Sequence, residues 1–188
     1  MRGSPGTIVL ITVASALAWV ASVLVHNRLL PGLFFAPGID MIFVPSGVRL
    51  FALMVGGIWA AAGVSLGTIF LAGSEFGFKD LVHIAVLSLT AGFAPYLSLL
   101  ATMRALGLTR DLKDLAPVHL PLISLGVGVG SAATHNLLFC ALGIQPWSRY
   151  APNTLTMAMG DFLGCLIAAL ILFAMLHFWR RRKGVRRP

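Results

Sequence analysis

Residues 34–67, FFAPGIDMIFVPSGVRLFALMVGGIWAAAGVSLG, decide the fold of this chain. The stretch contains two prolines, an acidic and a basic residue (Asp40 and Arg49), and then a long apolar run rich in small residues. Charged side chains so close to a membrane span are costly unless they are paired or have a function. We therefore expect the rest of the chain to form a helical bundle around this stretch.

The composition places the whole chain in the membrane class. Of its 188 residues, 58% are hydrophobic and 11% are charged, and the mean hydropathy is +0.91. Soluble domains carry about 25% charged residues. The sequence therefore predicts an all-α, polytopic integral membrane bundle of five to six transmembrane helices with one short re-entrant or broken segment. We expect residues 1–188 to form a single transmembrane domain.

The net charge of +8 comes from basic residues in short loops and at the C-terminus. The basic tail, residues 180–188, follows an apolar helix directly, and such a run anchors the cytoplasmic end of a membrane protein against anionic lipid. Arg104, Arg110 and Lys113 fall on the same side as the tail if two helices separate them. We therefore expect a cytoplasmic C-terminus, anionic lipid as the partner of the tail, and no binding of nucleic acid.

Five segments have the length and apolarity of a membrane span, which needs about 20 residues. They cover residues 7–25, 46–71, 80–103, 118–142 and 153–179, within about two to four residues at each end. The segment 30–44 is shorter and is interrupted by Pro31, Pro37 and Gly38. We favour a re-entrant piece there, which gives five spans and an external N-terminus. If it crosses instead, there are six spans and both termini are cytoplasmic.

Small residues spaced four apart predict close helix packing, because they let two backbones approach in lipid. The pairs that show this spacing are Ala14 with Ala18, Gly56 with Ala60, Gly63 with Gly67, Gly126 with Gly130, and Gly160 with Gly164. The GVGVG run at residues 126–130 lacks the strand and the lysine of a phosphate-binding loop. We therefore interpret it as a packing surface.

A few polar residues inside the spans are the candidate interior site. Arg49 is the only basic residue within the second predicted helix, and Asp161 is the only acidic residue in the last one. We hypothesise an ion pair between them; the alternative is that each reaches water separately near an interface. His135 and Asn136 form the most polar part of the fourth helix, so they are expected to face the interior, as is Asp40.

The sequence gives no sign of a metal, a cofactor or catalysis. The two cysteines lie in apolar segments, without the Cys-x-x-Cys spacing of a metal site. No two histidines share a helix at ligand spacing, and no serine, histidine and acid form a hydrolytic arrangement. We therefore expect a protein that binds no metal or cofactor and that is not an enzyme.

A Pro-x-Gly motif opening a helix, a nearby glycine and tryptophan, and a later Gly-Asp-x-x-Gly motif carry a family resemblance. The positions are Pro45, Ser46, Gly47, Gly57, Trp59, Gly160, Asp161 and Gly164. On these residues the chain resembles the integral membrane sensor domains of the first membrane-associated-sensor family over residues 29–72 and 155–175. The resemblance implies a bacterial inner-membrane sensor module, of the kind that precedes diguanylate cyclases and histidine kinases. We expect no such output domain here, so signalling would need a partner.

Three functions follow as expectations. The first is a non-catalytic, sensor-like protein that binds a small ligand or partner membrane proteins within the bilayer. The second is a substrate-capture or transport subunit, because the size and basic cytoplasmic end are similar to those of the capture subunits of energy-coupling-factor vitamin transporters. The third is a structural accessory subunit of a larger membrane complex, for which the small-residue faces would serve packing.

Overall fold

The computed structural model describes residues 4–36, 38–74, 79–109 and 113–182. Within these residues, five helices are each long and apolar enough to cross a membrane. They are α1 (Pro5–Leu29), α2 (Pro45–Ser74), α3 (Leu81–Ala105), α4 (His119–Ala141) and α5 (Tyr150–Arg182). The chain is therefore a multi-pass, all-α membrane protein, as predicted. The last residues of the basic tail, 183–188, lie outside the described residues, as do Glu75, Arg110 and Asp111.

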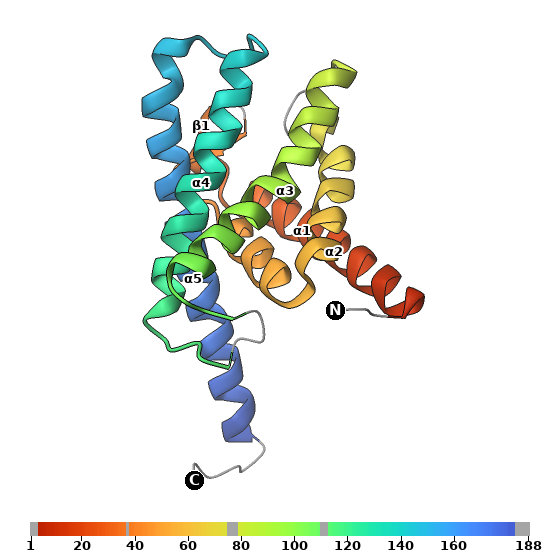
Figure 1. Ribbon diagram of the computed structural model, residues 1–188, viewed down its shortest axis with the longest axis vertical. Helices are drawn as coiled ribbons and strands as arrows, with labels where there is room; N and C mark the ends of the chain where they lie inside the picture. Colours follow the sequence, from red (N-terminus) through yellow and green to blue (C-terminus); the bar gives the residue numbers. More distant parts are fainter. Residues whose placement is uncertain (1–3, 37, 75–78, 110–112, 183–188) are drawn as a thin grey trace.

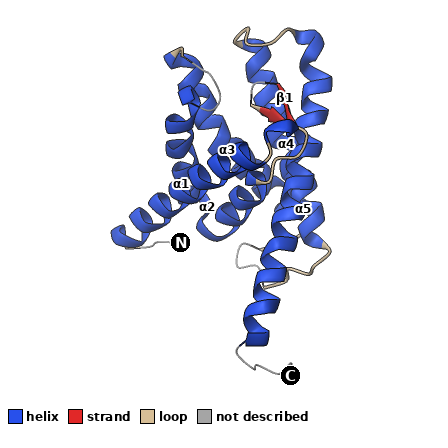
Figure 2. Cartoon of the chain, turned by 180° about the vertical axis from the view of Figure 1, so that it is seen from behind, coloured by secondary structure: helices blue, strands red, loops and turns tan. Residues whose placement is uncertain are grey.

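The segment between α1 and α2 is a short hairpin. A single helical turn, η1 (Pro31–Leu33), leads into β1 (Phe34–Ala36), which pairs antiparallel with β2 (Ile39–Asp40). Gly38 has a φ of 74°, a left-handed conformation that glycine adopts without steric cost. The hairpin lies beside α4 and α5 when the molecule is seen from behind (Figure 2). A second short turn, η2 (Trp147–Arg149), precedes α5.

Helix α2 is not one straight span, because it breaks at Gly57. That residue has φ 57° and ψ −133°, outside the helical region. The ribbon turns back on itself at this point, so that the first half, Pro45–Gly56, and the second half, residues 58–74, run in opposite senses (Figure 1). A residue with a side chain would be strained in this backbone conformation, so glycine is what permits the break.

Helix α1 packs parallel to the second half of α2. The hydroxyl of Thr12 donates to the carbonyl oxygen of Trp59 (3.3 Å), and the indole N–H of Trp19 donates to the hydroxyl of Thr68 (2.9 Å). Residue numbers therefore increase in the same direction along the two helices. The hairpin and the first half of α2 must therefore carry the chain from the end of α1 back toward the end of the molecule at which α1 begins. The start of α1 and the end of α5 consequently lie toward the same end of the molecule (Figure 1).

The five helices agree with the favoured count of five spans, but their directions do not place the two termini at opposite ends of the molecule. Residues 30–44 were too short to return the chain alone, but they are continued by the first half of α2, which the sequence analysis had assigned to an unbroken helix. The start of α1 and the end of α5 lie toward the same end of the molecule, which is the one feature of the alternative that the structure has. The error came from Gly57, because a single glycine in an apolar run resembles the packing glycines around it.

Most of the predicted packing positions lie at close contacts. Gly63 abuts the backbone of α1 at Thr12 and Ser15, and Gly67 lies against Trp19. Gly56 contacts Ile11, and Ala60 is fully buried. Gly126 and Gly130 lie against Thr102 and Ser98 of α3, whereas Gly160 and Gly164 lie against carbonyl oxygens of Asp40 and Phe43. Gly160 and Gly164 therefore pack against the segment that leads into α2, and not against another helix.

The predicted face of α1 is wrong for packing within the chain. Ala14 and Ala18 are exposed, and the residues that contact α2 include Thr12, Ser15, Ala16 and Trp19. The face that contains Thr12 and Trp19 packs against α2 instead, because these side chains also donate the two hydrogen bonds to α2. Ala14 and Ala18 remain available on the outer surface.

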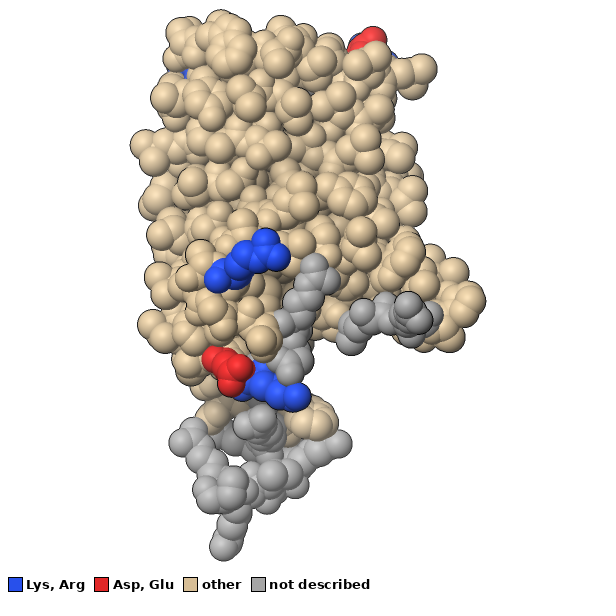
Figure 3. Space-filling model, viewed as in Figure 1, with Lys and Arg blue, Asp and Glu red and all other residues tan. Residues whose placement is uncertain are grey.

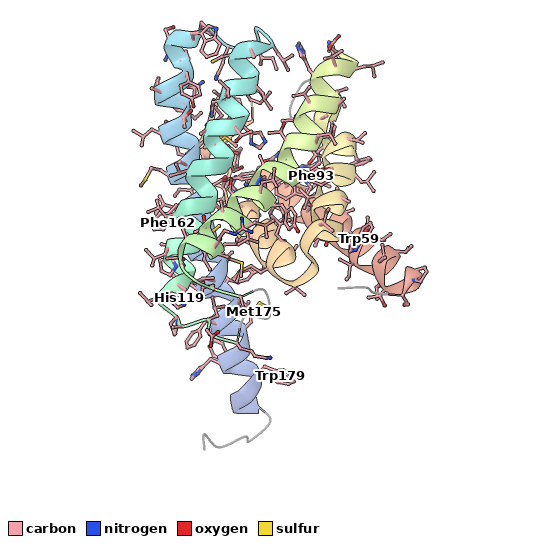
Figure 4. All side chains as sticks on the ribbon, in the orientation of Figure 1. Trp59, Phe93, His119, Phe162, Met175 and Trp179 are labelled. Atoms are coloured by element: carbon pink, nitrogen blue, oxygen red, sulfur yellow. The ribbon has the colours of Figure 1, made fainter. Side chains whose placement is uncertain are left out.

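The surface has the charge distribution of a membrane protein. On the face in Figure 3, the lower part carries basic side chains with an acidic one beside them, and the broad surface above is uncharged up to the opposite rim. The far end of α5 projects below the bundle and carries the exposed Met175 and Trp179 (Figure 4). Aromatic residues such as this tryptophan are common at the boundary between lipid and water.

Substitution of Gly63 by valine is expected to destabilise the bundle, because its side chain would collide with the backbone of Thr12. Overpacking of this kind costs about 1–3 kcal/mol. Thermal unfolding of the purified protein in detergent measures the effect. Gly32→Val is the matched control, since nothing lies within 4 Å of a side chain there. Equal melting temperatures for the two variants would contradict the close contact of α1 and α2.

Candidate functional site

The interior of the bundle contains the ion pair expected from the sequence. Nη2 of Arg49 lies 2.9 Å from Oδ2 of Asp161, and it donates a hydrogen bond to that oxygen. The two residues are 4% and 2% exposed. A buried pair of this kind is strongly destabilised when one partner is removed, because the other charge is left unpaired. The alternative in which each side chain reaches water separately is therefore wrong.

Aromatic side chains surround the ion pair on the side of α1. The guanidinium carbon of Arg49 lies 5.4 Å from the ring centre of Trp19, a cation–π contact. The ring of Phe43 meets Trp19 edge-on at 5.9 Å and His26 edge-on at 5.3 Å. These contacts join α1 to the start of α2, and they limit the access of water to the guanidinium.

The start of α2 is fixed to α5 by backbone contacts. The amide N–H of Phe43 donates to the carbonyl oxygen of Gly160 (3.0 Å). The hydroxyl of Ser46 lies 2.7 Å from the carbonyl oxygens of Phe43 and Asp161, and its single proton is shared between them. Because Gly160 and Gly164 have no side chains, the chain can approach α5 closely enough for these bonds.

The same close approach brings Asp40 into the polar interior. Oδ2 of Asp40 lies 3.8 Å from Nε2 of His26, which is 4% exposed. Asp40 stands in the hairpin, outside the five spanning helices, and burial raises the pKa of its carboxyl to about 6. The negative charge of Asp161 acts in the same direction as a smaller cause. Asp40, His26, Arg49 and Asp161 are hereafter called the polar cluster.

His135 and Asn136 are buried, as predicted, at 3% and 0% exposure. Nδ1 of His135 lies 3.0 Å from the carbonyl oxygen of Ser131, one turn earlier in α4. Asn136 belongs to a separate amide chain: Gln145 donates to its side-chain oxygen (3.0 Å), and Asn153 donates in turn to the side-chain oxygen of Gln145 (2.5 Å). This chain ties the loop between α4 and α5 to both helices.

A cavity of about 410 Å³ lies between the hairpin and the amide chain. Its apolar wall comes from the hairpin, the end of α4 and the following loop, and its polar wall from that loop and the start of α5. The lining residues are Phe35, Ala36, Ile39, Phe139, Ile144, Gln145, Arg149 and Asn153. We call this space the hairpin cavity.

Sequence reasoning identified Arg49, Asp161, Asp40, His135 and Asn136, but it missed the partners that complete the site. His26, Trp19 and Gln145 were not predicted to lie in the interior. The missed residues carry no local pattern, because they are brought to the cluster by the hairpin and by the parallel packing of α1. Among the described residues, no group of three or more His, Cys, Asp or Glu could hold a metal ion.

No family model, curated protein or solved structure matches this chain. The functional argument therefore rests on the geometry of the polar cluster and of the hairpin cavity.

The single variants Arg49→Met and Asp161→Leu are each expected to destabilise the protein by about 3–5 kcal/mol, because each leaves one buried charge unpaired. The double variant removes both charges, and it should be more stable than at least one of the single variants. Denaturant or thermal unfolding of all four proteins gives the coupling between the two positions. Additive losses would show that the two side chains do not interact.

Proposed function

We propose that this chain is a non-catalytic, sensor-like membrane protein of the bacterial cytoplasmic membrane that binds a small ligand in the hairpin cavity. One observation carries the proposal: the hairpin lines the cavity and also supplies the polar cluster with Asp40. Ile39 contributes to the cavity wall, and the next residue faces His26. A molecule in the cavity would therefore act directly on the element that completes the buried cluster.

The lining of the hairpin cavity favours a small molecule with an apolar body and an anionic head. Ligand sites commonly have volumes of about 300–1,000 Å³ and combine apolar walls with a few polar groups. Phe35, Ile39 and Phe139 supply the apolar surface. Arg149 supplies a positive charge whose guanidinium can hold a carboxylate through two hydrogen bonds. We therefore propose short-chain or aromatic carboxylates as the ligand class.

Signal transfer would use the packing of the bundle and not a chemical reaction. A ligand that binds one arrangement of the hairpin better than another shifts the population toward that arrangement. Because Phe43 contacts both Trp19 and His26, a shift of the hairpin would reach α1. The exposed Ala14 and Ala18 on the outer face of α1 suit a partner membrane helix that receives the change.

The positive-inside rule supports a cytoplasmic position for the end of α5 and for the loop between α3 and α4. In that orientation the hairpin cavity opens toward the outer side of the membrane. Anionic lipid is then the partner of the basic tail.

A substrate-capture or transport subunit is the second candidate. The observation that favours it is the broken chain, a hairpin and a half-helix, beside a buried acidic residue. Membrane transporters often place such breaks at their binding sites. Uptake of a labelled carboxylate by proteoliposomes that contain only this protein would favour transport over sensing, whereas binding without uptake would favour sensing.

Arg149→Gln is expected to weaken binding of hexanoate or benzoate by about tenfold or more, because a hydrogen bond to a charged group contributes about 1.5–3 kcal/mol. Ligand-induced thermal stabilisation of the purified protein measures the affinity. Arg104→Gln, which lies at the other end of the molecule, is the matched control and should bind as the unchanged protein does. Equal stabilisation by hexanol and hexanoate would exclude recognition of the anionic head.

A further inference from the structure

The polar cluster contains buried polar atoms that no hydrogen bond satisfies. Both ring nitrogens of His26 and the Oδ1 atom of Asp161 are buried without a hydrogen-bond partner. His26 faces Asp40 across 3.8 Å, longer than a hydrogen bond. Such groups are uncommon in folded proteins and call for an explanation in terms of function or of a bound species.

The charges of the cluster do not balance without an additional positive charge. The polar cluster contains two carboxyl groups, those of Asp40 and Asp161, and a single guanidinium, that of Arg49, which contacts Asp161. With His26 neutral, the cluster carries one net negative charge. A buried net charge is costly in a membrane protein, so the uptake of one positive charge is favoured.

We propose that the polar cluster is a proton-binding site in which the carboxyl of Asp40, beside the imidazole of His26, takes up and releases a single proton. Asp161 is in direct contact with Arg49, and an adjacent positive charge favours the ionised carboxylate, so we assign the proton to Asp40, whose neighbour His26 lies beyond hydrogen-bond distance. The Asp40 side chain keeps 15% of its surface exposed, and this opening allows exchange with water. The proposal does not rest on a ligand in the hairpin cavity.

A metal cation fits the cluster less well than a proton does. Sodium and other hard cations require several oxygen ligands around one point. The described residues offer no cluster of three or more His, Cys, Asp or Glu, and one member of the polar cluster is an imidazole. His26 also has no acceptor within hydrogen-bond distance, so a proton placed on its ring would bury an unpaired N–H. The Asp40 carboxyl is therefore the site of lowest cost.

Three helices contribute the other members of the polar cluster. His26 comes from α1, Arg49 from α2 and Asp161 from α5. His135 of α4 lies within electrostatic range of Arg49. Strand β1, which pairs with the strand that carries Asp40, contributes only Phe34, Phe35 and Ala36. Burial, as the larger cause, and the negative charge of Asp161 both raise the pKa of Asp40.

The sign of the pH dependence follows from this arrangement. The pKa of Asp40 is about 6 in the folded protein and 3.8 in an exposed chain. The folded state therefore binds more protons between these values, and stability falls as the pH rises from about 4 to about 6. Removal of the charge by Asp40→Asn should raise the melting temperature above about pH 6, by roughly 2–4 °C or more, with little effect near pH 4.

The experiment is a set of thermal unfolding curves of the full chain in detergent over this pH range. Asp114→Asn, an exposed carboxyl, is the matched control and should follow the unchanged protein at every pH. The same curves are recorded in sodium chloride and in choline chloride at equal ionic strength. A melting temperature that sodium raises in the unchanged protein, but not in Asp40→Asn, would overturn the proposal in favour of a metal cation site.

Infrared spectroscopy of the unchanged protein with isotopically labelled aspartate provides a test that needs no variant. We expect the carbonyl band of a protonated carboxyl to persist to about pH 6, well above the range in which exposed aspartates ionise, near 3.9. Absence of this band above pH 5 would overturn the proposal, as would identical pH dependence of unfolding in the unchanged protein and in Asp40→Asn.

Discussion

The buried ion pair between Arg49 and Asp161 is the constraint on which the rest of the structure depends. Neither charge can be left alone in an apolar bundle, so the start of α2 must lie against α5 although more than a hundred residues separate them. The cation–π contact with Trp19 adds α1 to the same centre. Three helices are thereby fixed around one pair of side chains.

That requirement explains the positions of the glycines. For Arg49 to reach Asp161, the chain entering α2 must pass close to α5, and it does so over Gly160 and Gly164. The amide N–H of Phe43, which precedes α2, then donates to the carbonyl oxygen of Gly160. This hydrogen bond satisfies a backbone donor in a region where unpaired backbone groups are costly. A break at Gly57 lets the chain turn back toward α1 and α3.

The functional proposals arise from the same geometry. The end of the hairpin that leads into α2 is held close to the ion pair. As a result, the two faces of the hairpin contact different parts of the molecule. One face lines the hairpin cavity, and the other delivers Asp40 to His26. A short element between a cavity and a charge cluster has few ways to move without changing both. Coupling between ligand and proton would follow from that shared element.

The sequence by itself determined the membrane class, the approximate limits of the helices and the close packing at Gly126 and Gly130, and it offered the pairing of Arg49 with Asp161 as one of two alternatives. These predictions follow from hydropathy, from residue spacing and from the scarcity of charge. A single basic and a single acidic side chain in apolar helices have few other residues with which to pair. Only the tertiary structure decided the break at Gly57, the parallel packing of α1 and the place of His26. Backbone direction at a glycine and contacts between distant segments depend on the packing of the whole bundle, which no local pattern encodes.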